Sequence, residues 1–395
     1  MTGAKPWLVV TGDVAPMREV TEHDERLRSL LRDAELAFGN LETPLTARGA
    51  RAEKAATHRA HPDRIADVKA FGFDVVTLAN NHMLDYGVQG LADTLEGVKS
   101  AGIVSVGAGL DRASALRAAV RPSSRGSVAF LGLCAALPPG FAATDERPGV
   151  APLRVAQSVA IDPAIQQEQP GGAPFMHTTA HAPDVAAACD AIGAARREAR
   201  FVIVALHWGI PHGFAARSYG VLAEYQRPVA HALVDAGADL VVGHHPHVVH
   251  PLERYKGALI AYSLGNYVFH SWGHFARPAP AALPADAAAE ELEETLALDM
   301  PFAPFRNAFG AEEMLESIVV VADPVDAGTR YRLVPTVMRK GDPFIPDDAR
   351  AEAVLRRLTH PALPPFDGGY TPRISLDRDP RLGVVVGEVT IPEAR

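Results

Sequence analysis

The chain has 395 residues, an apolar fraction of 48%, a formal net charge of −9 and a pI of about 6.0. This composition is sufficient for a large core, and the charge argues against nucleic acid or an anionic membrane as the main partner. No run approaches the ~18 apolar residues of a membrane span.

Apolar runs and amphipathic stretches alternate along the chain, which predicts an α/β fold. The expected elements are, in order, a strand at Trp7–Thr11, a helix at Asp24–Ala34, a strand at Leu36–Phe38, a helix at Pro62–Phe71, a strand at Val75–Ala79, helices at Gly90–Ala101 and Asp184–Arg200, a strand at Phe201–Leu206, a helix at Val221–Ala236, strands at Leu240–Val242, Leu259–Ser263, Ile318–Val321 and Tyr331–Met338, a helix at Asp347–Leu358, and a strand at Val384–Val389.

Two stretches lack such periodicity. Residues 138–180 are rich in Pro, Gly, Ala and Gln, which predicts a long loop excursion. Residues 276–315 are dominated by Pro and Ala and then by clustered Glu, which is typical of a surface insertion or a substrate-covering lid. Because no clear linker precedes residue 275, we expect one large domain: a core over 1–275, the insertion, and strands and a helix over 316–395 that complete the same domain.

The location of the protein is predicted from its first residues and its two cysteines. The start, MTGAKPWLVVTGD, lacks the apolar stretch and small-residue cleavage site of a signal peptide. Cys134 and Cys189 lie in apolar or alanine-rich surroundings, which predicts two buried reduced thiols. We therefore expect a cytoplasmic protein.

Five of the predicted strands run directly into polar residues of the types that bind metals or transfer protons. In α/β proteins ligands bind at the carboxyl ends of strands, so we expect these side chains to converge on one site. The polar groups that follow the five strands are Asp13; Asn40 and Glu42; Asn80, Asn81 and His82, with Asp85 three residues on; His207 and Trp208; and His244, His245 and His247.

The motifs GD, NLETPLT, LANNHMLDYG, HWG, GHHPHVV and YSLGNYVF occur in this order from Leu8 to Phe269. This order resembles the CapA-type proteins (poly-gamma-glutamate capsule biosynthesis proteins) of the calcineurin-like metallophosphoesterase superfamily. The resemblance implies layered α/β/β/α sheets with the site at the carboxyl ends of the strands. It also implies a peptide-like substrate, and some cytoplasmic relatives resemble enzymes that epimerise a residue of a lasso peptide.

The same resemblance assigns metal ligands, should a metal be bound. Asp13 is the aspartate of the first motif, and Glu42 stands where the superfamily has a bridging aspartate. Two ligands of the phosphoesterases are altered, because Ala15 replaces a histidine and Asn40-Leu41-Glu42 replaces the usual second motif. The candidate ligands of a divalent Mn, Zn or Fe ion are Asp13, Glu42, Asn81, His207, His245 and His247.

The other candidate site residues have catalytic or substrate-binding roles. We expect His82 to transfer protons, with Asp85 orienting its imidazole. Asp13, His245, His247 and His270 are the further catalytic candidates. The candidate substrate-binding residues are Asn40, Asn80, Trp208, Asn266 and Trp272.

Three functions fit these residues. In the first, Asp13 and a histidine of the 245–274 region move a proton between the two faces of a peptide α-carbon, without a cofactor. In the second, a divalent metal activates water for hydrolysis of a phosphoester or another bond. In the third, the scaffold binds a polymer without catalysis. The altered metal motifs, the missing anchor and the expected lid place epimerisation of a peptide, such as a ribosomal precursor peptide, first.

Overall fold

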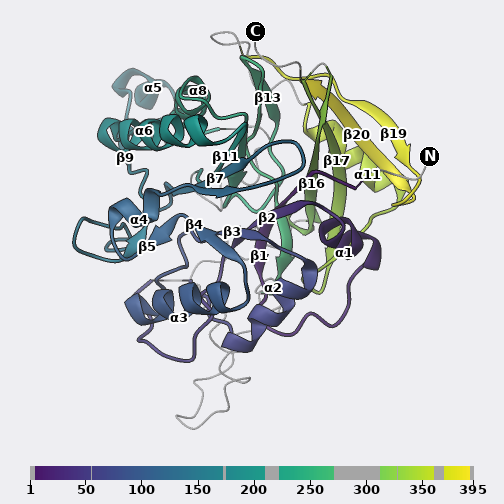
Figure 1. Ribbon diagram of the computed structural model, residues 1–395. Coiled ribbons are helices and arrows are strands. Elements are labelled where there is room, and N and C mark those ends of the chain that lie inside the picture. The colour runs from purple at the N-terminus through teal and green to yellow at the C-terminus, as the bar shows by residue number, and fades with distance from the viewer. Residues whose placement is uncertain are drawn as a thin grey trace.

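The computed structural model describes residues 5–54, 56–171, 175–209, 222–270, 312–326, 328–359 and 369–391. In this part of the chain two β-sheets pack face to face, and helices cover both outer faces (Figure 1). This α/β/β/α layering is the calcineurin-like metallophosphoesterase fold, as the resemblance predicts.

The first sheet is built around β1, which places Asp13. β1 pairs with β16 through Leu8–Val10 and with β15 from Asp13 onward, while β2 lies parallel to it on the other side. Gly12 lies at the change of partner, where a Cβ would stand 1.9 Å from the carbonyl oxygen of Gly265, so no larger residue fits. The sheet contains β1 (Leu8–Ala15), β2 (Leu36–Leu41), β3 (Val75–Thr77), β4 (Val104–Val106), β15 (Asn266–Phe269), β16 (Glu316–Val325), β17 (Gly328–Arg339), β18 (Asp342–Phe344), β19 (Ser375–Asp379) and β20 (Val384–Ile391).

The second sheet delivers the histidines. Its strands β7, β11, β12 and β14 are parallel, so His207 and His244 reach the same edge. Gly243 precedes His244 at a close approach, where a Cβ would stand 1.9 Å from the carbonyl oxygen of Tyr262. The strands are β6 (Ala119–Arg121), β7 (Val128–Cys134), β11 (Phe201–His207), β12 (Leu240–His244), β13 (Leu252–Tyr255) and β14 (Ala258–Ala261).

Three apolar clusters hold the layers together. The cluster between the sheets includes Phe38, Phe130 and Ile203, which are all fully buried. The outer clusters are formed with α1 (Glu25–Arg32), α2 (Ile65–Phe71) and α3 (Gly87–Ser100) on the first sheet, and with α4 (Arg112–Leu116), α6 (Ala182–Glu198) and α8 (Gln226–Asp235) on the second. The short η1 (Pro62–Arg64) leads into α2, and α11 (Asp348–Arg357) packs on β17 and β20.

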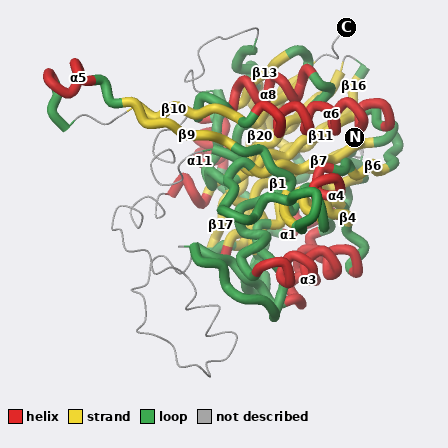
Figure 2. Tube along the Cα trace, turned by 90° about the vertical axis from the view of Figure 1, so that its left-hand side faces the viewer, coloured by secondary structure: helices red, strands yellow, loops and turns green. Residues whose placement is uncertain are grey.

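The expected loop excursion at 138–180 is wrong for much of its length. After the short pair β5 (Ala108–Gly109) and β8 (Gly149–Val150), strands β9 (Val155–Ala160) and β10 (Phe175–Ala180) form a hairpin with α5 (Pro163–Glu168) at its tip. The hairpin projects from the body (Figure 2). Most of β9 is exposed, so its sequence carries no apolar alternation, and periodicity could not reveal it.

The other expectations have mixed outcomes. Both cysteines are free thiols, with Cys134 buried and Cys189 half-buried. Nearly all of the expected insertion at 276–315 lies outside the described residues, which resume with η3 (Glu312–Leu315). Among the described helices, none is both long and apolar enough to cross a membrane.

Candidate metal centre

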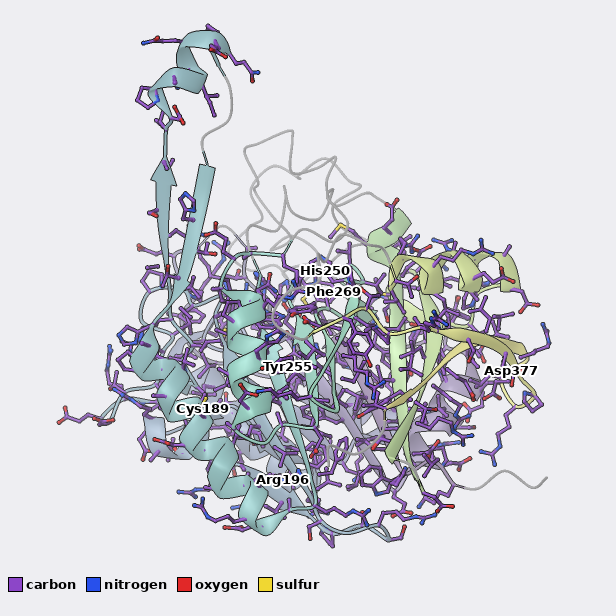
Figure 3. All side chains as sticks on the ribbon, turned by 90° about the horizontal axis from the view of Figure 1, so that it is seen from above. Cys189, Arg196, His250, Tyr255, Phe269 and Asp377 are labelled. Carbon is purple, nitrogen blue, oxygen red and sulfur yellow. The ribbon has the colours of Figure 1, made fainter. Side chains whose placement is uncertain are left out.

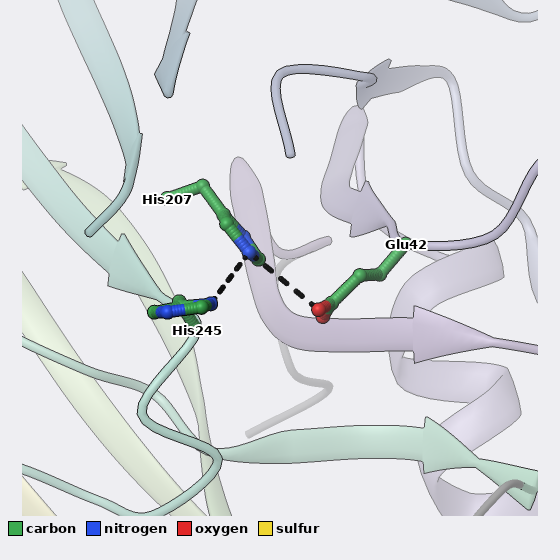
Figure 4. Close-up of side chains that lie close together, drawn as sticks. All are labelled: Glu42, His207 and His245. Carbon is green, nitrogen blue, oxygen red and sulfur yellow. Dashed lines mark hydrogen bonds and ion pairs between the residues drawn. The ribbon is translucent and has the colours of Figure 1, made fainter. Parts of the chain in front are cut away.

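The polar residues at the strand ends meet at one place, where the parallel strands of both sheets terminate. Two sets of side chains each bring their ligand atoms within 4.8 Å of one another. One set is Glu42, His207 and His245 (Figure 4), and the other is Asp13, Glu42 and His247. All of these residues are buried, and Glu42 belongs to both sets.

Glu42 is a buried carboxylate without a hydrogen-bond donor. Among the described residues, neither of its side-chain oxygens accepts a hydrogen bond. Its Oε1 lies 3.5 Å from His207 Nε2, 3.8 Å from His247 Nε2 and 4.0 Å from His82 Nε2. Burial, together with the charge of Asp13, raises the pKa of Glu42 well above its ordinary value. An ionised group in such surroundings needs a counter-charge.

His207 lies at the centre of a group of lone-pair atoms. Its Nε2 is 2.9 Å from His245 Nδ1, 3.0 Å from Asn81 Oδ1 and 3.5 Å from Glu42 Oε1. A ring nitrogen carries at most one hydrogen, so it can serve only one of these acceptors at a time. The arrangement is therefore rich in electron-pair donors and poor in protons.

Asp13 has the opposite surroundings. Its Oδ1 accepts hydrogen bonds from Asn40 Nδ2 and His244 Nδ1, each at 2.9 Å, and its Oδ2 accepts one from the backbone N–H of His245 at 3.3 Å. His247 Nδ1 lies 3.3 Å from Oδ2. Burial alone would raise the pKa of Asp13, but the hydrogen bonds of His244 and His247 outweigh it, so the pKa falls well below its ordinary value.

The backbone that presents His245 and His247 is strained. Their φ angles are +92° and +58°, in the left-handed region that side chains disfavour. Such residues cost about 1–3 kcal/mol each and cluster at functional sites. The strain lets two residues separated only by Pro246 both reach Asp13 or Glu42, while Asn266 Oδ1 accepts a hydrogen bond from His247 Nδ1 at 2.8 Å and fixes its ring.

These residues fit a divalent metal. Imidazole, carboxylate and amide oxygens are suitable ligands for Zn, Mn and Fe, and the unpartnered Glu42 oxygens are the atoms that a cation would satisfy. The predicted ligands Asp13, Glu42, Asn81, His207, His245 and His247 are all brought together; Asn81 joins the others through its contact with His207.

His82 and Asp85 form a pair beside this cluster. His82 Nδ1 lies 2.6 Å from Asp85 Oδ2, which is the orienting contact expected for a functional imidazole. Burial lowers the pKa of His82 well below its ordinary value and raises the pKa of Asp85 to about 7. His82 is therefore a neutral imidazole with its Nε2 on the side of Glu42.

Lys54 and His58 also belong to this site, although no sequence motif marks them. Lys54 Nζ lies 2.6 Å from Asp85 Oδ1 and donates to the carbonyl oxygen of Asn81. The ring of His58 stacks on His82 with centroids 3.5 Å apart. Burial lowers the pKa of His58 to about 3. Both residues lie in an irregular segment after Glu42 that has no strand or helix pattern to place it.

Four of the predicted substrate-binding residues make contacts within the protein, and their binding roles stay predictions. Asn40 and Asn80 bond to each other at 3.1 Å, and Asn40 also holds Asp13. Asn266 positions His247. Trp208 is fully buried and donates to the carbonyl oxygen of Tyr262. Trp208 is the first residue after β11, and its ring stacks on Tyr262 within the apolar core. Trp272 lies outside the described residues.

His270 contacts two other residues of the protein through its ring. Its Nε2 lies 2.7 Å from Asp342 Oδ1, and its Nδ1 accepts a hydrogen bond from the backbone N–H of Arg18 at 3.2 Å. Both ring nitrogens are thus engaged by the protein, and the catalytic role expected for His270 stays a prediction.

Comparison with known proteins identifies the family. The family model described as "Bacterial capsule synthesis protein PGA_cap" matches residues 8–271. The chain belongs to this family. Its members include the CapA proteins suggested by the resemblance, and the motifs used above lie within the matched range.

Three relatives illustrate the similarity. A probable polyglutamine synthesis accessory protein of Mycobacterium tuberculosis is 38% identical over 234 residues, which cover 58% of this chain and 54% of that protein. The PGA biosynthesis protein CapA of Bacillus subtilis is 33% identical over 243 residues, covering 61% and 54%. An uncharacterized protein of Sinorhizobium fredii is 28% identical over 417 residues, covering 89% and 88%. The chain thus spans about half the length of the first two.

Proposed function

We propose that this member of the capsule synthesis family is a divalent-metal-dependent hydrolase that acts on a peptide or a peptide-like polymer. The observation that carries the proposal is the buried Glu42, which is shared by two ligand sets and accepts no hydrogen bond from the residues that the structure describes. The names of relatives, polyglutamine synthesis accessory protein and PGA biosynthesis protein, support a polymer or peptide substrate. A cytoplasmic location is part of the proposal.

Different residues of the site would have different roles in such a reaction. A divalent ion, when bound, lowers the pKa of its water toward ~7 and polarises the oxygen of the bond to be cleaved. Asp13, Glu42, Asn81, His207, His245 and His247 would hold it. His82 would take up a proton at Nε2 from the attacking water and pass it to the leaving group, because its Nδ1 is fixed by Asp85 and its Nε2 lies near Glu42.

The test is to remove and restore the metal. The protein is stripped with chelator, dialysed, and reloaded with Mn²⁺, Zn²⁺ or Fe²⁺. It is then incubated with a phosphodiester reporter and with γ-linked glutamate oligomers, and product release is measured. Turnover that returns with a metal and is lost in the Glu42→Gln variant supports the proposal. Full turnover in chelator contradicts it.

A second candidate, epimerisation of a peptide α-carbon, has one observation in its favour. Asp13 is satisfied by protein donors alone and is held ionised without a metal, and the neutral His82 belongs to the same site. One group would take the α-proton and another would return a proton from the opposite face. We now place this candidate second because its mechanism gives the unpartnered Glu42 no role.

Solvent exchange separates the two candidates. Deuterium from D₂O that enters the α-carbon of a glutamate oligomer in the presence of chelator favours epimerisation. Hydrolysis that needs metal, with no exchange, favours the first candidate. Neither reaction, together with measurable binding of the oligomer, favours a non-catalytic binding role.

A further inference from the structure

A second charged feature lies away from the metal centre. One hollow of about 470 Å³ and another of about 360 Å³ share Trp7 and Pro324 as wall residues. We call the two together the basic groove. Its cationic residues are Lys5, Arg125, Arg330, Arg332 and Arg381 in the larger hollow and Arg196, Arg200 and Lys256 in the smaller one.

The basic groove lies at the opposite edge of the sheets from the metal centre. Trp7 immediately precedes β1 and Phe201 begins β11, whereas Asp13 and His207 lie toward the other ends of these strands. Figure 3 shows the same separation, with Arg196 at one end of the molecule and Phe269 and His250 toward the other. A ligand of the groove would therefore not compete for the metal centre.

The charge of the groove is unlike that of the whole chain. Eight cationic side chains line it against three carboxylates, those of Glu35, Asp239 and Asp323, in a protein of net charge −9. Two more carboxylates pair with groove cations from outside the lining, Asp235 with Lys256 and Asp379 with Arg332, and Arg196 pairs with Asp239, so the cations still outnumber the carboxylates. Glu35 is already bound by the backbone N–H and hydroxyl of Ser124. A local excess of positive charge on an acidic protein concentrates anions at that place.

Three of the cations are exposed, namely Lys5, Arg125 and Arg330. Lys5 and Arg125 help to lower the pKa of the Glu35 carboxyl, but in the described part of the chain none of the three forms a direct ion pair with a carboxylate. Arg332, by contrast, is fixed by Asp379 at 2.8 Å and by Asp323 at 3.4 Å. The groove thus contains a guanidinium group that is held by carboxylates, that of Arg332, and exposed guanidinium groups without a direct ion pair, those of Arg125 and Arg330.

The floor of the groove is rigid. Trp7 is buried, donates to Ser123 Oγ at 2.8 Å and packs edge-on against Phe201 with centroids 5.1 Å apart. Tyr331 is also buried. Because the floor is already packed, the groove does not have to form when a ligand binds.

We propose that the basic groove binds an acidic stretch of polypeptide, at a site separate from the metal centre. Guanidinium groups pair with carboxylates through two parallel hydrogen bonds. The cations line hollows, which accept a chain but not the flat surface of a bilayer. Nucleic acid carries about one charge per 1.7 Å of duplex, a denser charge than the three exposed cations of the groove can match.

The test uses a fluorescein-labelled octaglutamate peptide, with octaglutamine as its uncharged control. Affinity is measured by anisotropy at roughly 50 mM and roughly 200 mM salt, since ionic binding weakens with salt. The groove variant combines Lys5→Gln, Arg125→Gln and Arg330→Gln. The matched control combines Lys69→Gln, Lys99→Gln and Arg147→Gln, which removes three exposed cations far from the groove.

We expect the groove variant to bind octaglutamate about tenfold more weakly and the matched control to change by less than about twofold. The Glu42→Gln variant should bind as well as the unaltered protein, which keeps this result independent of the proposed hydrolase activity. Equal losses in the two triple variants, equal binding of octaglutamine, tighter binding of single-stranded DNA or anionic vesicles, or no binding at the lower salt would each overturn the proposal.

Discussion

Asp13 and Glu42 are carboxylates at the ends of the neighbouring strands β1 and β2, yet the protein treats them in opposite ways. Asp13 is held by an amide, an imidazole and a backbone N–H, whereas Glu42 accepts no hydrogen bond from any described residue. The first region is complete as the chain folds. The side-chain oxygens of Glu42 gain a partner only when a cation binds.

The difference separates two properties of a metal site, the stability of the metal-free fold and the affinity for the metal. The donors around Asp13 stabilise the fold whether or not a metal is present. The surroundings of Glu42 disfavour its ionised form until a cation compensates for them. Stability of the metal-free protein should therefore depend on Asp13, and metal affinity should depend on Glu42.

The largest expected effect is on stability. Asp13→Asn should lower the free energy of unfolding of the metal-free protein by about 3 kcal/mol, because an amide N–H₂ would face buried donors that now meet a carboxylate. Urea unfolding in chelator measures this. In the same assay at about pH 5, where Glu42 is still protonated in the fold, Glu42→Gln should change the free energy of unfolding by less than about 1 kcal/mol. Equal destabilisation by the two variants would show that the hydrogen bonds of Asp13 do not make it more important than Glu42 for stability.

Metal affinity should show the reverse order. Glu42→Gln keeps the size of the side chain but removes the charge shared by both ligand sets. We expect binding of Mn²⁺ or Zn²⁺ by calorimetry to weaken about 100-fold or more, since even residues that only orient a ligand contribute ~10–100-fold. Asn266→Ala, which frees the His247 ring, is the matched change of a residue that is not a ligand and should cost about tenfold. If Glu42→Gln binds metal normally, the hydrolase proposal fails.

Much of the fold and the core of the site could be predicted from the sequence. Five apolar runs that end in Asp, Glu, Asn or His are a local signal, and parallel strands must bring such ends together. Adjacency in the sequence is a weaker signal for contact with a substrate. Trp208 directly follows β11 and its side chain is fully buried, and Asn40 donates a hydrogen bond to Asp13.

Lys54 and His58 could not have been predicted in this way. They lie in a segment without periodicity and reach the site only because that segment packs back against Asp85 and His82. Nothing in the spacing of their neighbours encodes this contact. The β9–β10 hairpin was missed for a related reason, since an exposed strand has no buried face to set a pattern.

The pH dependence of stability should also distinguish the two carboxylates. The pKa of Glu42 is raised in the fold, so its contribution to stability is fully present below its unfolded value of about 4.5 and is lost as the pH rises through the raised value. The pKa of Asp13 is lowered, so its contribution is lost only in acid, below about pH 4.

Between about pH 5 and 8 the metal-free protein should therefore lose stability relative to Glu42→Gln, by up to ~1.4 kcal/mol per pH unit while Glu42 titrates. The measurement is urea unfolding of both proteins in chelator across this range. Subtracting the two curves removes the contributions of His58, His82 and Asp85, which both proteins share. Parallel curves would mean that Glu42 is not protonated in the fold.

The smallest expected effect concerns Lys54, whose ammonium group lies near the proposed cation site at Glu42. Lys54 and Glu42 interact electrostatically, and the Lys54 ammonium also holds Asp85 and the carbonyl oxygen of Asn81. Its charge should repel an incoming divalent ion, so Lys54→Met should tighten metal binding by about threefold, and Lys54→Arg, which keeps the charge, should leave it unchanged. Calorimetry in the same buffer measures both variants. Weaker binding by Lys54→Met would show instead that the contact of Lys54 with Asn81 contributes more to metal affinity than the charge of Lys54 removes. The surroundings of Glu42, like those of Asp13, would then be organised by the protein before a metal binds.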